Sequence, residues 1–247
     1  MDALIREKQI NERLEGKCMP ADVDKKIRIK ILKSGPYLVT GSIPLSEKII
    51  VLKRKNYEYH HKRDFPLFDE YELCRCGRTK KSPYCDGTHE RSGFIGKETA
   101  SRDDYARRAQ LLEGPDLDLM DDNRCAYARF CQRNAGSVWD LTENSDDPHA
   151  RSEAIIGACD CPTGRLVALD KDGNPFELRF EPAIEILQDA ENRVSGPLYV
   201  KGSIPIESSK GFVYEARNRV ALCRCGQSGN KPYCDATHVS AEYRDRE

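Results

Sequence analysis

The same arrangement of cysteine and histidine residues occurs twice in this chain. In each copy, a Cys-x-Cys pair is followed nine residues later by a third cysteine and, four residues beyond it, by a histidine. The residues are Cys74, Cys76, Cys85 and His89 in the first copy and Cys223, Cys225, Cys234 and His238 in the second. A second segment, residues 35–45, recurs as residues 196–206 and carries Gly-Ser-Ile-Pro in both places. This tandem repeat predicts two small modules of similar fold.

The composition limits what these modules can bind. Of 247 residues, 40 are Lys or Arg and 41 are Asp or Glu, so the formal charge of -1 offers no general attraction for nucleic acid or an anionic membrane. Charged residues make up 33% of the chain and hydrophobic residues 38%, which favours several small modules over one large core. We therefore expect neither nucleic acid nor a membrane as a partner.

Strand patterns precede the cysteines in both repeats. Residues 27–31 and 183–186 alternate apolar and polar side chains, and residues 210–214 and 219–222 also predict strands. We expect a small antiparallel sheet in each copy, with the cysteines in loops beyond the strands. The charged run at residues 53–64 lengthens the first copy and is predicted to be a loop.

The composition changes between the repeats. Residues 101–112 have a helical pattern, and the acidic run at residues 116–122 is predicted to be a solvated loop, with docking of a basic partner as the alternative. Residues 2–16 predict a short N-terminal helix. The fold class that follows is α+β, with two small β-rich modules on either side of a small α+β module. The predicted boundaries are residues 1–25 for the N-terminal helix or arm, 26–98 for the first module, 99–180 for the middle module and 181–247 for the second module.

The number of cysteines favours metal binding over disulfides. Eleven is an odd number, no apolar run opens the sequence and none reaches 18 residues, so we expect a cytoplasmic chain with reduced thiols. Thiols at this density bind metal or take part in redox chemistry. Three thiolates and one imidazole form a complete four-coordinate set, which suits zinc or an iron-sulfur cluster. A Cys-x-Cys pair is less usual in compact zinc sites, which favour two or more intervening residues.

An aspartate lies three residues before the histidine in both copies. Asp86 precedes His89, and Asp235 precedes His238. This spacing predicts that the aspartate caps a helix whose first turn carries the histidine. A neutral imidazole in place of a thiolate removes one negative charge, which raises the reduction potential of a bound cluster.

Both ligand sets resemble the CDGSH iron-sulfur family, the NEET-like proteins. The matched residues are Cys74, Cys76, Thr79, Pro83, Cys85, Asp86, Gly87, Thr88 and His89, then Cys223, Cys225, Ser228, Pro232, Cys234, Asp235, Thr237 and His238. Ala236 stands where the family usually has glycine. The resemblance implies a β-cap and a [2Fe-2S] cluster in each copy, with the Cys-x-Cys pair on the inner iron and the later cysteine and histidine on the outer, more exposed iron. It also implies paired clusters, in a pseudo-dimer within one chain or in a homodimer.

Four further cysteines lie between the repeats, namely Cys125, Cys131, Cys159 and Cys161. Residues 123–169 resemble divergent single-cluster ferredoxin domains, which implies a ferredoxin-like α+β module with a [3Fe-4S] or [4Fe-4S] cluster. Cys125, Cys131 and Cys161 are sufficient for three irons, and Cys159 is the nearby cysteine for a fourth. Tyr127 occupies a position where that family often has histidine. Packing of buried thiols is the alternative.

The sequence therefore predicts an iron-sulfur protein that transfers single electrons, or stores and passes on clusters, with a redox protein or an apo-iron-sulfur protein as partner. We expect no enzyme activity, because the chain has no glycine-rich phosphate loop, Ser-His-Asp arrangement or His-Glu-x-x-His segment. The alternative is a zinc-stabilised interaction module that uses the same ligand sets and contacts a partner or nucleic acid through basic residues, although the net charge argues against it. Those residues are Arg75, Arg78, Lys80 and Lys81.

Overall fold

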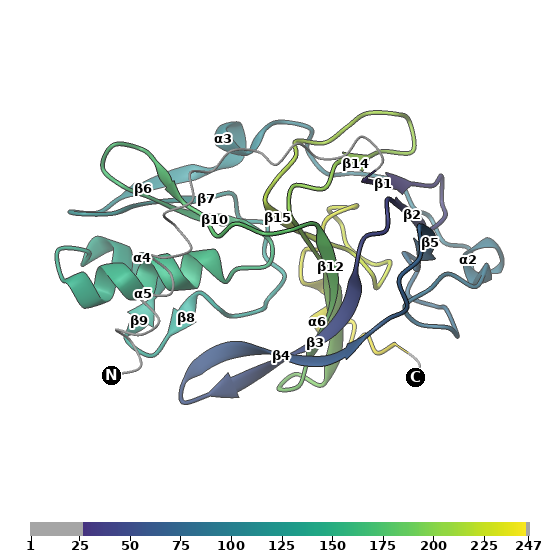
Figure 1. The fold of residues 1–247 in the computed structure, drawn as a ribbon, viewed down its shortest axis with the longest axis horizontal. Coiled ribbons are helices and arrows are strands. Elements are labelled where there is room, and N and C mark those ends of the chain that lie inside the picture. The colour runs from purple at the N-terminus through teal and green to yellow at the C-terminus, as the bar shows by residue number, and fades with distance from the viewer. Residues whose placement is uncertain (1–26, 246–247) are drawn as a thin grey trace.

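The computed structural model describes residues 27–245 and has mixed α+β structure, with mostly strands and a few helices, as the sequence predicted (Figure 1). The helix predicted at residues 2–16 lies outside the described residues. Within the described part of the chain, no helix is long and apolar enough to cross a membrane. The predicted boundaries between modules stay a prediction.

Four strands of the first repeat have counterparts in the second, in the same order along the chain. Strands form here because apolar and polar side chains alternate along the chain. In the first strand, for example, Ile29 and Ile31 are buried, while Arg28 and Lys30 are not. The strands of the first repeat are β1 (Arg28–Ile31), β2 (Tyr37–Thr40), β3 (Leu45–Lys53) and β5 (Glu70–Leu73). Those of the second are β12 (Ala183–Asp189), β13 (Val194–Lys201), β14 (Ile206–Glu207) and β15 (Arg219–Leu222).

The two repeats exchange their third strands. β3 pairs in parallel with β12, and β14 pairs in parallel with β1. The resulting sheets have the orders β14-β1-β2-β5 and β15-β13-β12-β3-β4, where β4 is Asn56–Asp64, so each contains strands of both repeats. The expectation of a separate antiparallel sheet in each copy is therefore wrong, because each sheet gains a parallel strand from the other copy.

One hydrophobic core serves both repeats. Buried side chains of the first repeat, such as Tyr37 and Leu73, belong to the same cluster as Leu222 and Tyr233 of the second. The hydroxyl of Tyr37 also donates to the backbone oxygen of Cys223 over 2.8 Å. Because this core and the exchanged strands are shared, the cysteine loops of the two repeats are held in one body.

The charged run at residues 53–64 is a strand rather than the predicted loop. β4 (Asn56–Asp64) pairs with β3 in a long hairpin that turns at Arg54 and Lys55, both with positive φ. Tyr59 stacks on Phe130 of the middle region, with 4.2 Å between the ring centroids. The alternation of tyrosines with polar residues therefore reflects packing against the middle region. In the second repeat, residues 219–222 form the predicted strand, but residues 210–214 form a turn with a single bridge between Glu207 and Val213.

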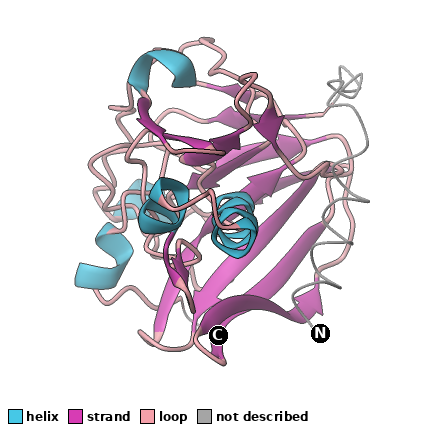
Figure 2. Cartoon of the chain, turned by 90° about the vertical axis from the view of Figure 1, so that its left-hand side faces the viewer, coloured by secondary structure: helices cyan, strands magenta, loops and turns pink. Residues whose placement is uncertain are grey.

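The middle region packs two helices against a four-stranded sheet of order β11-β10-β7-β6. Figure 2 views the molecule from the side of this region, and its helices stand in front of the larger sheet formed by the repeats. Its elements are α3 (Tyr105–Arg108), β6 (Gln110–Glu113), β7 (Asp118–Asp121), β8 (Gln132–Arg133), β9 (Gly136–Ser137), α4 (Val138–Glu143), α5 (Pro148–Cys159), β10 (Leu166–Leu169) and β11 (Pro175–Phe176).

Two predictions for this region are wrong. The helical pattern at residues 101–112 yields only the short α3, because residues 110–113 pair with β7 as β6. The acidic run does not form a solvated loop either. Asp118 pairs with Lys171 at 2.6 Å, and Asp121 pairs with Arg165, so the carboxylates are neutralised within the chain.

Candidate metal centres

Each ligand set consists of two closely spaced pairs. The sulfur atoms of Cys74 and Cys76 are 3.6 Å apart, and the sulfur of Cys85 lies 3.2 Å from Nδ1 of His89. In the second set, the corresponding distances are 3.7 Å between the cysteines and 3.4 Å between cysteine and histidine. The residues of that set are Cys223, Cys225, Cys234 and His238.

The pair distances match two ligands on one metal ion. Two sulfurs bound at about 2.3 Å to a tetrahedral metal lie about 3.8 Å apart. Among residues 27–245, no group of three or more His, Cys, Asp or Glu side chains converges on a single metal ion. What the structure shows directly in each set is two close pairs, one of two cysteines and one of a cysteine and a histidine.

The loop that carries the third cysteine is held by the aspartate. Asp86 accepts hydrogen bonds from the backbone N–H of Lys80 at 2.9 Å and of Thr88 at 3.0 Å. The residue that caps the short helix α2 (Thr88–Arg91) is Gly87, so the prediction that the aspartate itself is the N-cap is wrong by one residue. His89 nevertheless lies in the first turn, as predicted.

The second repeat has the same loop architecture. Asp235 accepts hydrogen bonds from the backbone N–H of Gly229 at 2.7 Å and of Thr237 at 3.1 Å. Ala236 caps α6 (Thr237–Ser240) with φ 69°, close to the 79° of Gly87. The alanine therefore adopts the backbone conformation of the glycine it replaces, so His238 occupies the equivalent helical position.

The arginine inside each Cys-Arg-Cys segment is structural, which the sequence analysis missed. Arg75 donates from Nε to the backbone oxygen of Gly35 at 2.8 Å, and Arg224 donates in the same way to Gly196 at 3.1 Å. Each is only 1% exposed. Arg75 therefore cannot contact a partner, as the zinc-module alternative required. The sequence contains a signal for this structural role, because both the arginine and the Gly-Pro segment whose glycine it binds occur in each repeat.

Three of the four middle cysteines lie together. The neighbouring thiols of Cys161 and Cys125, together with burial as the larger cause, raise the pKa of Cys131 to about 11. Cys159 is directed elsewhere: its thiol donates to the backbone oxygen of Phe176 at 3.3 Å, and burial raises its pKa to about 12. The structure thus groups three thiols and places the fourth in the core beneath β11.

Comparisons with known families agree with these arrangements. A family model described as iron-binding zinc finger, CDGSH type, matches residues 34–90 and again residues 195–239. A second, described as divergent 4Fe-4S mono-cluster, matches residues 112–171. The chain carries two CDGSH-type regions around a mono-cluster region. Both resemblances predicted from the sequence are therefore confirmed. No curated protein and no solved structure matched the chain.

The Cys-x-Cys-Gly loops of the two CDGSH regions touch through their backbones. A Cβ atom on Gly77 would lie 2.5 Å from the backbone oxygen of Cys225, and one on Gly226 would lie 2.6 Å from that of Cys76. Both glycines have positive φ, so other side chains are excluded twice, by conformation and by space. Asp245 ties the loops together further, because it accepts hydrogen bonds from Ser82 and Arg224.

One sulfur of each Cys-x-Cys pair is prepared for metal binding. A hydrogen bond between the two sulfurs lowers the pKa of one thiol in each pair, Cys74 and Cys223, against the effect of burial. The same hydrogen bond and burial raise the pKa of the partner thiols, Cys76 and Cys225. Because metals bind the thiolate, a lowered pKa in one thiol of each pair favours metal binding.

The Cys-His pairs of the two sets, named here the outer pairs, differ in their surroundings. Cys85 and His89 in the first CDGSH region are half-buried. Cys234 and His238 in the second are each only 3% exposed. Burial lowers the pKa of His238 to about 4.

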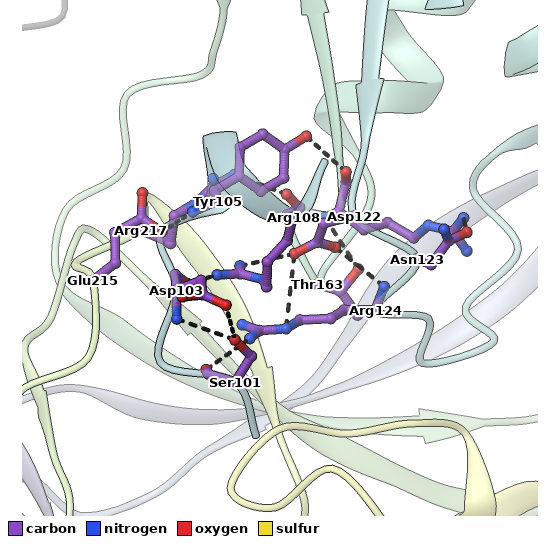
Figure 3. Close-up of polar contacts among 12 residues, drawn as sticks. Ser101, Asp103, Tyr105, Arg108, Asp122, Asn123, Arg124, Thr163, Glu215 and Arg217 are labelled. Atoms are coloured by element: carbon purple, nitrogen blue, oxygen red, sulfur yellow. Dashed lines mark hydrogen bonds and ion pairs between the residues drawn. The ribbon is translucent and has the colours of Figure 1, made fainter. Parts of the chain in front are cut away.

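The mono-cluster region covers the second outer pair. A network around Asp122 fixes this contact: Arg108 donates to the carboxylate at 3.0 Å, and the Arg124 backbone N–H donates at 3.1 Å (Figure 3). The Arg124 guanidinium then lies 4.1 Å from the ring centroid of Tyr233, the residue before Cys234. Cys125 and Cys234 line the same pocket, so a mono-cluster cysteine adjoins an outer ligand of the second CDGSH region.

Proposed function

We propose that this iron-sulfur protein carries single electrons through three cluster sites. Each CDGSH region would hold a [2Fe-2S] cluster, and the mono-cluster region a [3Fe-4S] or [4Fe-4S] cluster. When bound, such clusters accept and release one electron without breaking bonds. The arrangement of the ligands in close pairs carries the proposal, because two neighbouring pairs suit the two irons of a [2Fe-2S] core.

The ligand assignment follows the pairs. Cys74 and Cys76 would hold the inner iron of the first CDGSH region, and Cys85 and His89 the outer iron. Nδ1 of the histidine faces the cysteine sulfur, so Nδ1 would be the nitrogen that binds the iron. The second region would use Cys223 and Cys225 on the inner iron and Cys234 and His238 on the outer, again through Nδ1.

The three thiols of Cys125, Cys131 and Cys161 support the third cluster. They suffice for a [3Fe-4S] cluster, whereas a [4Fe-4S] cluster would take a fourth ligand that is not a cysteine, because the thiol of Cys159 is hydrogen-bonded to Phe176. Arg165 lies beside Cys125, and its positive charge would offset the negative charge of a thiolate-ligated cluster.

The contacts between the three proposed cluster sites support a role in electron transfer and not in catalysis. The inner ligands Cys76 and Cys225 belong to loops in backbone contact, and Cys125 shares a pocket with Cys234. The second CDGSH site thus lies between the other two, in contact with the mono-cluster region on one side and with the first CDGSH loop on the other. The paired CDGSH regions form a pseudo-dimer within the chain, supported by the exchanged strands β3 and β14.

Cluster donation is the second candidate, and half-exposed Cys85 and His89 favour it. The outer iron of the first region would be the point of release. Incubation with an apo-ferredoxin separates the two functions. Transfer of iron and sulfide to that acceptor would support donation, and retention in both oxidation states would support electron carriage alone.

Analysis of anaerobically purified protein tests the main proposal. We expect inorganic sulfide and iron, visible absorption that dithionite bleaches, and paramagnetic signals from more than one reduced cluster. Cys76→Ser and Cys225→Ser should each remove one [2Fe-2S] signal and keep the other. Stoichiometric zinc without sulfide would overturn the proposal in favour of the zinc-stabilised module.

A further inference from the structure

In each CDGSH region, the chain beyond the histidine passes over the buried arginine of the Cys-Arg-Cys segment. Five residues after the histidine stands an aromatic residue, Phe94 in the first region and Tyr243 in the second. Cζ of Arg75 lies 5.3 Å from the ring centroid of Phe94, and Cζ of Arg224 lies 5.6 Å from the ring centroid of Tyr243. The two arginines therefore have equivalent aromatic neighbours.

Seven residues after the histidine, the two regions differ. Asp245 of the second region forms an ion pair with Arg224, whereas Gly96 holds the equivalent position in the first region. A Cβ atom on Gly96 would collide with Nη2 of Arg75 and lie 2.9 Å from a ring carbon of Phe94, so a larger residue would displace the arginine. The acid that neutralises the arginine of the second region thus has no counterpart in the first.

Arg75 has no carboxylate partner among residues 27–245. Its Nε donates to the backbone oxygen of Gly35 at 2.8 Å and its Nη2 to that of Leu32 at 3.1 Å, while Nη1 has no hydrogen-bond partner within the chain. The side chain is 1% exposed, so solvent does not compensate its charge. Because arginine stays protonated in proteins, the first region contains a buried positive charge that no acid of the described chain neutralises.

The charge of Arg75 lies beside the first ligand set. Arg75 stands between the two inner cysteines in the sequence. Gly35, whose oxygen accepts the Nε bond, also approaches the histidine ligand, because a Cβ atom on it would lie 3.7 Å from Nε2 of His89. Arg224 holds the same place in the second sequence motif, but its pair with Asp245 has no net charge. A negatively charged cluster would therefore meet a full positive charge in the first region and a neutral ion pair at the equivalent position in the second.

Other charged groups near the first set lie at or near the surface. Burial is the larger cause that raises the pKa of Cys85, and the carboxylates of Glu72 and Asp86 add to it. Glu72 is exposed and Asp86 is half-exposed, and the basic residues of the loop, Arg78, Lys80 and Lys81, are exposed as well. Water and salt screen such charges, whereas a charge inside the protein acts through a lower dielectric. The field at the first set therefore depends more on Arg75 than on these groups of both signs.

We propose that the unpaired charge of Arg75 raises the reduction potential of the first CDGSH centre, and that Asp245 cancels the equivalent effect of Arg224 on the second. This inference rests on the proposed function. The step concerned is the transfer of one electron from an external one-electron reductant to the first cluster: the reductant is oxidised, and no bond forms or breaks. Reduction adds a negative charge to the centre, and a nearby buried positive charge stabilises that state.

A redox titration of the cluster-loaded full chain, with dithionite as reductant, tests the proposal. The test variant Arg75→Met replaces the guanidinium with an uncharged side chain. We expect reduction of the first centre to become about tenfold less favourable, which corresponds to a potential about 59 mV lower, and the second centre to change less. Arg75→Lys retains the charge and should restore most of the wild-type potential. The Cys76→Ser and Cys225→Ser proteins identify the signal of each centre.

The matched control removes the equivalent arginine together with its acid, as Arg224→Met with Asp245→Asn. This double variant loses a buried guanidinium but leaves the local net charge unchanged, so both potentials should shift less than half as much as the first centre does in Arg75→Met. Asp245→Asn alone leaves Arg224 unpaired, and it should make reduction of the second centre several-fold more favourable.

Iron, sulfide and the visible spectrum should match the wild type in every variant, which shows that each protein holds its clusters. An unchanged first centre in Arg75→Met would overturn the proposal, and so would an equal shift in the double variant or in Arg75→Lys. If Arg75→Met does not hold its first cluster, Asp245→Asn decides, since an unchanged potential of the second centre would overturn the role of pairing. Protein without sulfide would overturn the proposed function itself.

Discussion

The two CDGSH regions have the same ligand loop in different surroundings. The residues that shape the loop recur: Arg75 and Arg224 bond the same strand carbonyl, and Asp86 and Asp235 hold the same turn. Other residues of the loop do not recur: exposed Arg78, Lys80 and Lys81 have uncharged equivalents in the second region, where Lys231 stands in place of Ser82. Duplication has therefore preserved the metal-binding geometry, while packing decides which copy faces solvent.

The two Cys-His pairs differ in exposure although their loops are attached to the core in the same way. Both loops follow strands of the shared core, and the two loops contact each other at Gly77 and Gly226. The mono-cluster region makes the difference, because Ala126 and Arg124 pack only on the second loop. Two sites with the same loop can thus differ in exposure because a third region packs on only one of them.

Removal of iron by a chelator should distinguish the regions most strongly. The outer pair Cys85 and His89 is half-exposed, whereas release from Cys234 and His238 requires local opening of the contact with the mono-cluster region. Each ~1.4 kcal/mol of opening free energy slows release about tenfold. We expect biphasic bleaching with phases separated by about tenfold or more.

The variants His89→Ala and His238→Ala assign the two phases. Loss of the His89 ligand should accelerate only the fast phase, and loss of His238 only the slow one. A single phase in the wild type would contradict the difference in accessibility.

Asp245→Asn should destabilise the second loop by about 2 kcal/mol, because it leaves the buried guanidinium of Arg224 without its ionic partner. Burial opposes the shift, but the Arg224 charge and the hydrogen bonds from Ser195 and Ser82 lower the pKa of this carboxyl well below its usual range. A carboxyl with a lowered folded-state pKa stabilises the fold above its unfolded-state pKa of about 3.9 and loses that effect as the pH falls.

Urea unfolding between pH 7 and pH 3 checks this prediction. The wild type should lose more stability than the variant as the pH falls through the range of unfolded aspartate. Asp64→Asn is the control, because that side chain is 77% exposed and should change stability little. Parallel pH profiles of wild type and Asp245→Asn would contradict the role of Arg224 as partner.

The grouping of cysteine and histidine in both loops could be predicted from the sequence, and the fold that the two repeats share could not. Spacing of cysteine and histidine is local information, and it predicted the loops that the structure forms. The pairing of β3 with β12 joins Leu45 to Ile184 across the whole middle region, and no local pattern specifies that register. Strand exchange depends on which two apolar faces pack best, which is a property of the assembled core.

The other wrong predictions concern segments rich in charged residues. Residues 53–64 and 116–122 contain so many charges that solvation was the simplest interpretation. Their partners lie far away in sequence: Tyr59 packs on Phe130, and Asp121 pairs with Arg165. Local composition cannot reveal such partners, so a charged run that alternates with aromatic residues is as compatible with a strand as with a loop.

Arg124→Met should weaken the cover over the second CDGSH region by about 1–2 kcal/mol, since it removes a cation–π contact with Tyr233 and an ion pair with Asp122. Loss of this positive charge also disfavours the reduced, more negative state of the nearby cluster. We therefore expect a lower reduction potential for the second centre and no change in the first. Arg107→Met is the control, because Arg107 is exposed. Equal shifts of both centres in a redox titration would contradict the local role of Arg124.

The smallest expected effect concerns the residue that caps each histidine helix. Gly87 and Ala236 both have positive φ, which costs alanine about 1–2 kcal/mol, while glycine loses about 0.5–1 kcal/mol of extra chain entropy on folding. A Cβ on Gly87 would meet no atom within 4 Å, so only the backbone term changes there. Gly87→Ala should therefore destabilise the protein by about 0.5–1 kcal/mol, and Ala236→Gly should stabilise it by a similar amount. Urea unfolding of equally cluster-loaded proteins measures both. A loss of stability in Ala236→Gly would mean that the alanine methyl contributes packing that outweighs its backbone strain, and the two loops would then differ in more than their cover.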